Sequence, residues 1–186
     1  MNMRRKLIVL LAIATLVSIV NASVFVYYPI NLTISPQEPP VVFVQGSNTN
    51  GTDLRGNTIT VVIGAYNTSL SIEVHPTLQR NYYYNISNIN NNDNSNAYYI
   101  KFRVISPITD NRVSAAYLII NGDYSNKIDL KQTGLQPSTW FTLGAGSKLR
   151  VDLYLVLTGY ADSSITVEVD LIYSTTTTET PPMPPT

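Results

Sequence analysis

Apolar and polar residues alternate with a period of two along most of the chain. The clearest case is residues 23–35, in which every even position is apolar or aromatic: Val24, Val26, Tyr28, Ile30, Leu32 and Ile34. This period places the six side chains on one face of an extended strand. Pro29 cannot donate a ladder hydrogen bond, so an edge or inserted position suits this strand better than a central one. We expect the strand to complete either its own domain or that of a neighbour.

The same alternation predicts about nine further strands between residues 41 and 173, and no segment beyond the N-terminal 22 residues has a helical period. We expect strands at residues 41–44, 58–66, 70–74, 100–104, 115–120, 128–131, 140–143, 148–157 and 165–173. Many short strands separated by turn residues indicate an all-β protein with an antiparallel β-sandwich.

Two hairpins and one long loop are predicted between these strands. Asn121-Gly122 is the strongest hairpin signal, because both residues tolerate the positive φ angles of a tight turn. We expect strands 148–157 and 165–173 to form a second hairpin, with Arg150, Asp152, Glu168 and Asp170 facing outward. Seven of the twelve residues in 85–96 are Asn, so we expect an exposed loop there.

Several segments lie outside the predicted β domain of residues 41–173. Residues 1–22 combine Arg4, Arg5 and Lys6 with an apolar run and a small residue, Ala22, the layout of a cleaved signal peptide. An uncleaved membrane anchor is the alternative. Residues 36–40 form a stiff Pro-rich spacer, and residues 174–186 form a Thr/Pro-rich tail that cannot bury a core.

Composition narrows the possible chemistry. Charged residues make up only 13% of the chain and there is no Cys, which removes disulfides and thiolate chemistry. Lys plus Arg equal Asp plus Glu at 12 each, and three of the basic residues lie in the leader. The remaining chain therefore has a small negative charge, which argues against nucleic acid as a partner.

No residue pattern indicates catalysis or a bound metal, so we expect a non-enzymatic protein without a cofactor. His75, the only histidine, falls on the outward phase of its strand. The acidic residues of the strands alternate with apolar residues, which is typical of the solvent-exposed face of a sheet. A pair of catalytic carboxylates of the glycosidase type is the minor alternative. Loop acids such as Asp53 and Asp93 do not form a calcium-loop pattern.

Three other sets of residues are candidates for modification or contact. N-x-S/T sequons mark Asn31, Asn50, Asn67 and Asn85 as acceptors for N-linked glycans in an exported chain, although Asn, Ser and Thr are common enough here for chance matches. Lysines could form isopeptide crosslinks with Asn or Asp. Tyrosines could line a sugar-binding surface or, as we favour, a subunit contact; they are Tyr27, Tyr28, Tyr82, Tyr83, Tyr84, Tyr98 and Tyr99.

The arrangement resembles the exported filament subunits of archaeal threads and bundling pili, which are similar in style to the bacterial TasA/camelysin biofilm-fibre proteins. The resemblance rests on the leader, the strand that begins at Ser23, and the closing block 140–173. In that block Phe141, Leu143 and Gly146 precede the long strand Lys148–Leu157. The Thr/Pro tail has no counterpart in this family pattern.

The resemblance implies an Ig-like or jelly-roll-like pilin sandwich that lacks one strand and is completed by an N-terminal donor strand. Carried onto this chain, the donor would be Val24, Val26, Tyr28, Ile30, Leu32 and Ile34, inserted into the next copy of a homopolymer. We expect a secreted, glycosylated cell-surface filament for adhesion or biofilm, in contact with the membrane only during export. The alternative function is a cell-surface glycan-binding β-sandwich module.

Overall fold

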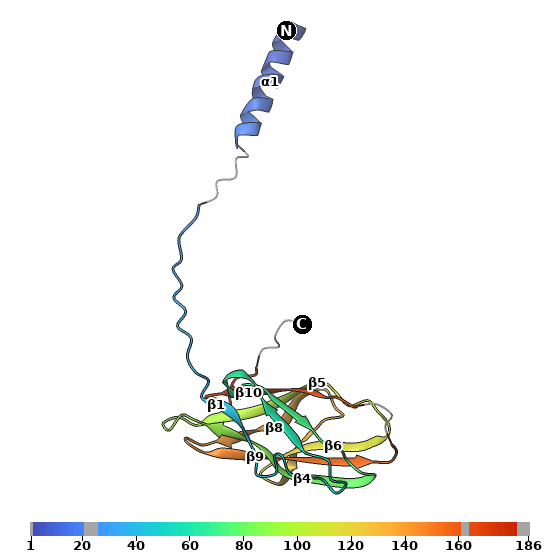
Figure 1. Cartoon of the computed structure of the whole chain (residues 1–186). Helices are drawn as coiled ribbons and strands as arrows, with labels where there is room; N and C mark the ends of the chain where they lie inside the picture. Colours follow the sequence, from blue (N-terminus) through green and yellow to red (C-terminus); the bar gives the residue numbers. More distant parts are fainter. Residues whose placement is uncertain (1, 21–25, 161–163, 182–186) are drawn as a thin grey trace. The chain divides into compact units, whose positions relative to one another are not determined.

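The computed structural model describes residues 2–20, 26–160 and 164–181, and for residues 16–20 it describes the backbone alone. The chain divides into two compact units, Met1–Pro36 and Gln37–Thr186. In the first unit, helix α1 spans Met3–Val20 and covers most of the predicted leader (Figure 1). A search of the described residues finds no helix that is both long and apolar enough to cross a membrane.

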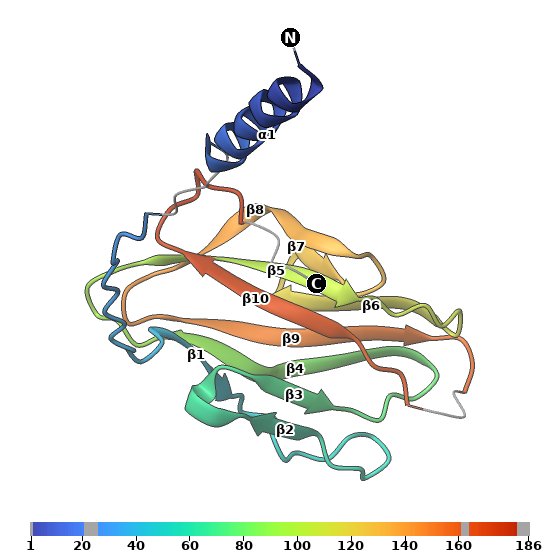
Figure 2. The same cartoon turned by 90° about the horizontal axis from the view of Figure 1, so that it is seen from above.

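The second unit is mainly β, with antiparallel sheets of five, three and two strands. The five-stranded sheet has the order β1-β4-β9-β6-β7, the three-stranded sheet β10-β5-β8, and the smallest sheet pairs β2 with β3 (Figure 2). The bounds are β1 Val41–Gln45, β2 Thr60–Ile63, β3 Leu70–Glu73, β4 Gln79–Asn91, β5 Tyr98–Ser106, β6 Val113–Ile120, β7 Asp123–Asp129, β8 Gly134–Leu143, β9 Lys148–Leu157 and β10 Glu168–Ser174.

The two larger sheets share one core. The inward set predicted for β9 is buried, from Leu149 to Leu157, and so are Ile100, Phe102 and Val104 of β5. All of these side chains belong to one hydrophobic cluster, so the sheets face one another in a sandwich-like arrangement. The alternation in the sequence therefore predicted the buried face of both strands correctly.

The Asn121-Gly122 hairpin is confirmed. Strands β6 and β7 pair antiparallel with Ile120 opposite Asp123, which leaves a two-residue loop. Asn121 has φ 52° and Gly122 has φ 79°, the left-handed values that a tight hairpin turn requires at both positions.

The predicted hairpin between 148–157 and 165–173 is wrong. Strand β9 lies between β4 and β6 in the five-stranded sheet, whereas β10 pairs with β5 in the other sheet. Both strands have a buried apolar face, but their pattern does not say which partner covers it. The two strands therefore belong to different sheets and do not pair with each other.

The predicted exposed loop at residues 85–96 is also wrong over its first half. Residues 85–91 continue β4, and Ile86 and Ile89 are fully buried. Several polar side chains of this stretch hydrogen-bond to nearby backbone: Ser87 Oγ donates to the Val44 carbonyl at 2.9 Å, and Asn91 Nδ2 to the Gly144 carbonyl at 2.9 Å. Since buried polar groups are tolerated when they are paired, an Asn-rich stretch can serve as a central strand.

Candidate functional site

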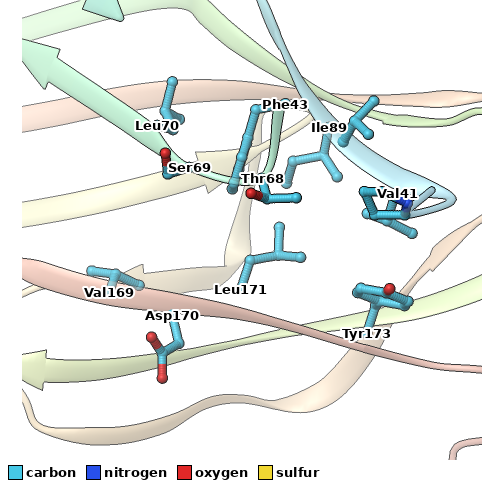
Figure 3. Close-up of a pocket in the computed structure, with 12 residues that line it drawn as sticks. Val41, Phe43, Thr68, Ser69, Leu70, Ile89, Val169, Asp170, Leu171 and Tyr173 are labelled. Atoms are coloured by element: carbon cyan, nitrogen blue, oxygen red, sulfur yellow. The ribbon is translucent and has the colours of Figure 1, made fainter. Parts of the chain in front are cut away.

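An open groove separates β1, the edge of the five-stranded sheet, from β10, the edge of the three-stranded sheet. Its volume is about 360 Å³. Leu171 and Tyr173 project from β10 toward the side of Phe43 and Val41, whereas Asp170 lies on the opposite side of the strand (Figure 3). The groove is lined by Pro39, Val41, Val42, Phe43, Thr68, Ser69, Leu70, Ile89, Val169, Asp170, Leu171 and Tyr173.

A second cavity of about 180 Å³ shares Phe43, Leu70, Val169 and Leu171 with this groove. All of its lining residues are apolar, and several belong to the core: Phe102, Leu130, Val151 and Leu153. Protein interiors are normally close-packed, and an empty space of about 150 Å³ is enough to hold benzene. The core is therefore underfilled next to β10.

Strand β10 also offers hydrogen-bonding groups to a further strand. Among the described residues its only strand partner is β5, so the backbone along its other edge pairs with no strand. Arg103 Nε of β5 donates to Asp170 Oδ2 at 3.1 Å and holds the opposite face of β10. An unpaired sheet edge beside an underfilled apolar groove is a template for an added strand.

The predicted donor residues lie in the first unit, in a segment without helix or strand between residues 26 and 36. Four of their large apolar side chains are more than three-quarters exposed: Tyr28, Ile30, Leu32 and Ile34. Val26 is 65% exposed, and Val24 lies outside the described residues. This stretch thus has a continuous apolar pattern that is not covered by its own unit.

The four predicted glycosylation sites differ in accessibility. Asn31, Asn50 and Asn67 are exposed. Asn85 is half-buried, its Nδ2 donates to Ser47 Oγ at 2.8 Å, and the Ser87 of its sequon is fully buried. Attachment of a sugar stays a prediction at all four, with Asn85 the most hindered.

The other candidate residues form local contacts. His75 is exposed, with its Nε2 3.6 Å from Glu73 Oε1. In the part of the chain that the structure describes, no three His, Cys, Asp or Glu side chains gather as a possible metal site. Lys101 Nζ donates to the Ser138 carbonyl at 3.0 Å, and Lys131 donates to the carbonyls of Asp110 and Val113.

Two loop aspartates shape turns. The amide of Asn96 holds the pKa of Asp93 at about 2, with further hydrogen bonds from the Ser95 and Asn96 backbone. Hydrogen bonds from the side chain and backbone of Arg112 lower the pKa of Asp110 to about 2 as well. Carboxylates that are already paired by neighbours in sequence are typical of turn formation.

The prediction that Asp152 of β9 faces outward, as on a solvent-exposed face, is only partly right. Asp152 does point away from the core, but it is fully buried. Its carboxylate accepts hydrogen bonds from Tyr82 Oη at 2.8 Å and from Arg150 Nε at 2.9 Å. Side chains on the outer face of the sheet cover it, which a period of two cannot predict.

The predicted tyrosines do not form one surface. Tyr83 and Tyr98 are buried, whereas Tyr82 and Tyr84 lie on the outer face of β4 and are partly exposed. There they join a group that the sequence reasoning missed: Tyr117, Tyr124 and Tyr154, with Tyr82 and Tyr154 6.5 Å apart between ring centroids. The alternation of the sequence already places Tyr117 and Tyr154 on the outer face of their strands, next to the inward-facing Leu118 and Leu153. This pattern could have predicted their position.

Comparison with known proteins identifies no relative: the chain matches no protein-family model and no curated protein.

Proposed function

We propose that this chain is a structural subunit of an extracellular filament that polymerises head to tail by donor-strand complementation. Residues 23–35 of one copy would add to the free edge of β10 in the next copy, with alternate side chains inserted into the groove between β1 and β10. In this proposal the fold is a pilin-like sandwich that lacks one strand, similar to that of archaeal threads, bundling pili and TasA/camelysin fibres.

The underfilled apolar space beside β10 is the observation that carries the proposal. A strand inserted there would fill the cavity bordered by Phe43, Leu171 and Val151. It would also satisfy the unpaired backbone of β10. The exposed side chains from Val26 to Ile34 have the strand period and the apolar character that this space requires.

The expected energy is sufficient for stable assembly. Burial of six large side chains contributes of order 10 kcal/mol before the costs of ordering. The Pro-rich spacer at residues 36–40 stiffens the connection to β1 and so disfavours insertion into the same copy. A head-to-tail contact of this kind does not close on itself, and it therefore propagates into a filament.

Export, glycosylation at the sequons and a role in adhesion or biofilm belong to the same proposal. The α1 segment would be the export leader. The side chains of Asn31, Asn50 and Asn67 are exposed and would carry sugars on the filament surface.

The first test is to delete residues 23–35 and examine the purified protein by electron microscopy. We expect a folded monomer that forms no filaments but binds a synthetic peptide of residues 23–35. Filaments formed by the deletion variant would contradict the proposal.

Point substitutions in the full chain provide the matched comparison, in a host that adds no N-linked sugar. Ile30→Asp and Leu32→Asp place a charge on the apolar face and should block assembly, since an unpaired buried charge is costly. Asn31→Asp adds the same charge between them on the other face and should still assemble. Equal filament yields from all three variants would refute insertion of the even-numbered face.

A further inference from the structure

Five tyrosines gather on the outer face of the five-stranded sheet, and we call them the tyrosine face: Tyr82, Tyr84, Tyr117, Tyr124 and Tyr154. The register places Tyr82 of β4, Tyr154 of β9 and Tyr117 of β6 in one row across three strands. The rings of Tyr117 and Tyr154 are nearly parallel, 6.0 Å apart, and Tyr82 stacks on Tyr124 at 6.4 Å.

Hydrogen bonds hold two rings of the tyrosine face, Tyr82 and Tyr84, although both are exposed to solvent. Tyr82 donates to the buried Asp152, and Arg150 Nη1 donates to Tyr84 Oη at 3.0 Å. The Arg150 guanidinium also lies 4.3 Å from the centroid of the Tyr84 ring. Tyr82, Tyr84 and Tyr124 each remain between 43% and 48% exposed. This part of the sheet surface is therefore already organised, and preorganisation lowers the entropic cost of binding.

A pocket of about 350 Å³ with both polar and apolar lining residues borders the tyrosine face and shares Tyr82 and Tyr84 with it. Its polar lining includes Asn48, Asp53, His75, Thr77 and Arg80. Arg80 is exposed, and its guanidinium makes no hydrogen bond or ion pair with any described residue. Ligand pockets of small molecules begin at about 300 Å³, so this pocket has room for a small polar ligand.

We propose that the tyrosine face and this pocket bind an oligosaccharide of pyranose rings. The C–H faces of the sugar would stack on the exposed rings of Tyr82, Tyr84 and Tyr124, because the negative ring face attracts their partial positive charge. The sugar hydroxyls would exchange hydrogen bonds with the polar side chains of this pocket. This binding would be additional to filament assembly, since the face lies on a different sheet surface from the groove between β1 and β10.

The chemistry favours a sugar over the Pro-rich tail, residues 180–186, which is the other candidate for an aromatic surface. The pocket presents both acceptors, such as Asn48 Oδ1, and donors, such as the Arg80 guanidinium. Each sugar hydroxyl can donate and accept, whereas Pro has no N–H to donate. A proline peptide would therefore leave the acceptors of the pocket without partners when it displaced their water.

Two sources could supply the sugar. One is the N-linked glycan of another copy, which would bundle filaments side by side. The other is an external polysaccharide, which would attach the filament to a surface. Both present pyranose rings, so the experiment uses a probe for each.

Isothermal titration of the full-length protein can test the proposal, with three sets of probes. They are the N-linked oligosaccharide released from the protein made in its native cells, a panel of cello-, chito- and malto-oligosaccharides, and a synthetic peptide of residues 180–186. Binding of the released glycan would point to the first source, and binding of the panel alone to the second. Binding of the peptide without any sugar, or of no probe, would overturn the proposal.

Variants locate the binding site. Tyr124→Ala removes an exposed ring, and Arg80→Ala removes a donor that has no described partner. Each should weaken sugar binding by about tenfold or more, the equivalent of one lost stacking or hydrogen-bonding contact. Tyr160→Ala is the control, because Tyr160 is 71% exposed and lies outside the tyrosine face. Unchanged sugar affinity in both test variants, with folding confirmed by circular dichroism, would also overturn the proposal.

Discussion

The Asp152 carboxylate accepts a hydrogen bond from the backbone N–H of Asn85, with 2.7 Å between Oδ1 and N. The register between β4 and β9 shifts between Tyr83 and Ser87, so at this bulge the ladder is interrupted. Asn85 has φ 46°, and its N–H is paired by a side chain of the neighbouring strand. A buried carboxylate thus takes the place of a backbone carbonyl at an irregular point of a central strand pair.

We expect Asp152→Asn to destabilise the protein by about 3 kcal/mol, because it leaves the Arg150 charge without its partner and breaks a buried network. The free energy of unfolding of the second unit, Gln37–Thr186, is measured by chemical denaturation. Glu73→Gln is the control, since the Glu73–His75 contact is exposed and should contribute little. Equal stability of the two variants would show that Asp152 does not support the bulge.

Gly46→Ala should cost at least about 2 kcal/mol, because the added Cβ meets backbone that has no room to move. It would lie 1.9 Å from the Asn85 carbonyl oxygen. At Gly144, the matched control, an added Cβ comes no closer than 3.3 Å to the flexible Ser147 side chain. Similar denaturation midpoints for the two alanine variants would contradict this account of the bulge.

Asn91→Ala tests the structural role of the Asn-rich segment. Asn91 is 3% exposed, and its Nδ2 donates to the carbonyls of Asn96 at 2.8 Å and Gly144 at 2.9 Å. Loss of these bonds should cost about 2 kcal/mol in unfolding free energy. Asn92 is exposed, so Asn92→Ala should be nearly neutral. If Asn91→Ala were equally neutral in denaturation experiments, the buried hydrogen bonds of Asn91 would not support the fold.

Val169→Phe should fill the apolar cavity beside β10 without the usual cost of overpacking. We expect the second unit, Gln37–Thr186, to keep or gain stability. Filament formation should fall, because the new ring occupies the space that the proposed donor strand needs. Thermal denaturation and electron microscopy measure the two effects. Glu168→Gln, at an exposed residue of β10 that does not line the groove, should leave assembly unchanged. Normal assembly of Val169→Phe would argue against this groove as the acceptor.

Stability should fall at high pH through two tyrosines. Burial raises the pKa of Tyr83 to about 12, and burial together with the hydrogen bond to Asp152 raises the pKa of Tyr82 to about 12. Unfolded tyrosines ionise near pH 10, so the folded protein retains these protons longer. The stabilisation is complete below about pH 10 and is lost as the pH rises through about 12. Tyr82→Phe should show a smaller loss of unfolding free energy over this window; an unchanged slope would contradict the raised pKa.

The local pattern determined which side chains face the core in most strands. Ile100, Phe102 and Val104, and the odd positions of β9 from Leu149 to Leu157, are buried as their alternation predicts. Asn121-Gly122 specified its own hairpin because the required φ angles depend on only two residues. Periodicity and turn chemistry are short-range properties, and a single sequence contains them.

Tertiary structure alone decided the strand partners, the burial of polar residues and the grouping of surface side chains. Strand β10 joins β5 rather than β9, and Asp152 and Asn91 are buried because distant segments provide their hydrogen bonds. The tyrosine face and the groove between β1 and β10 combine residues from strands far apart in the chain. These features depend on long-range packing, in which many pairings satisfy the same alternation and only the complete fold selects one.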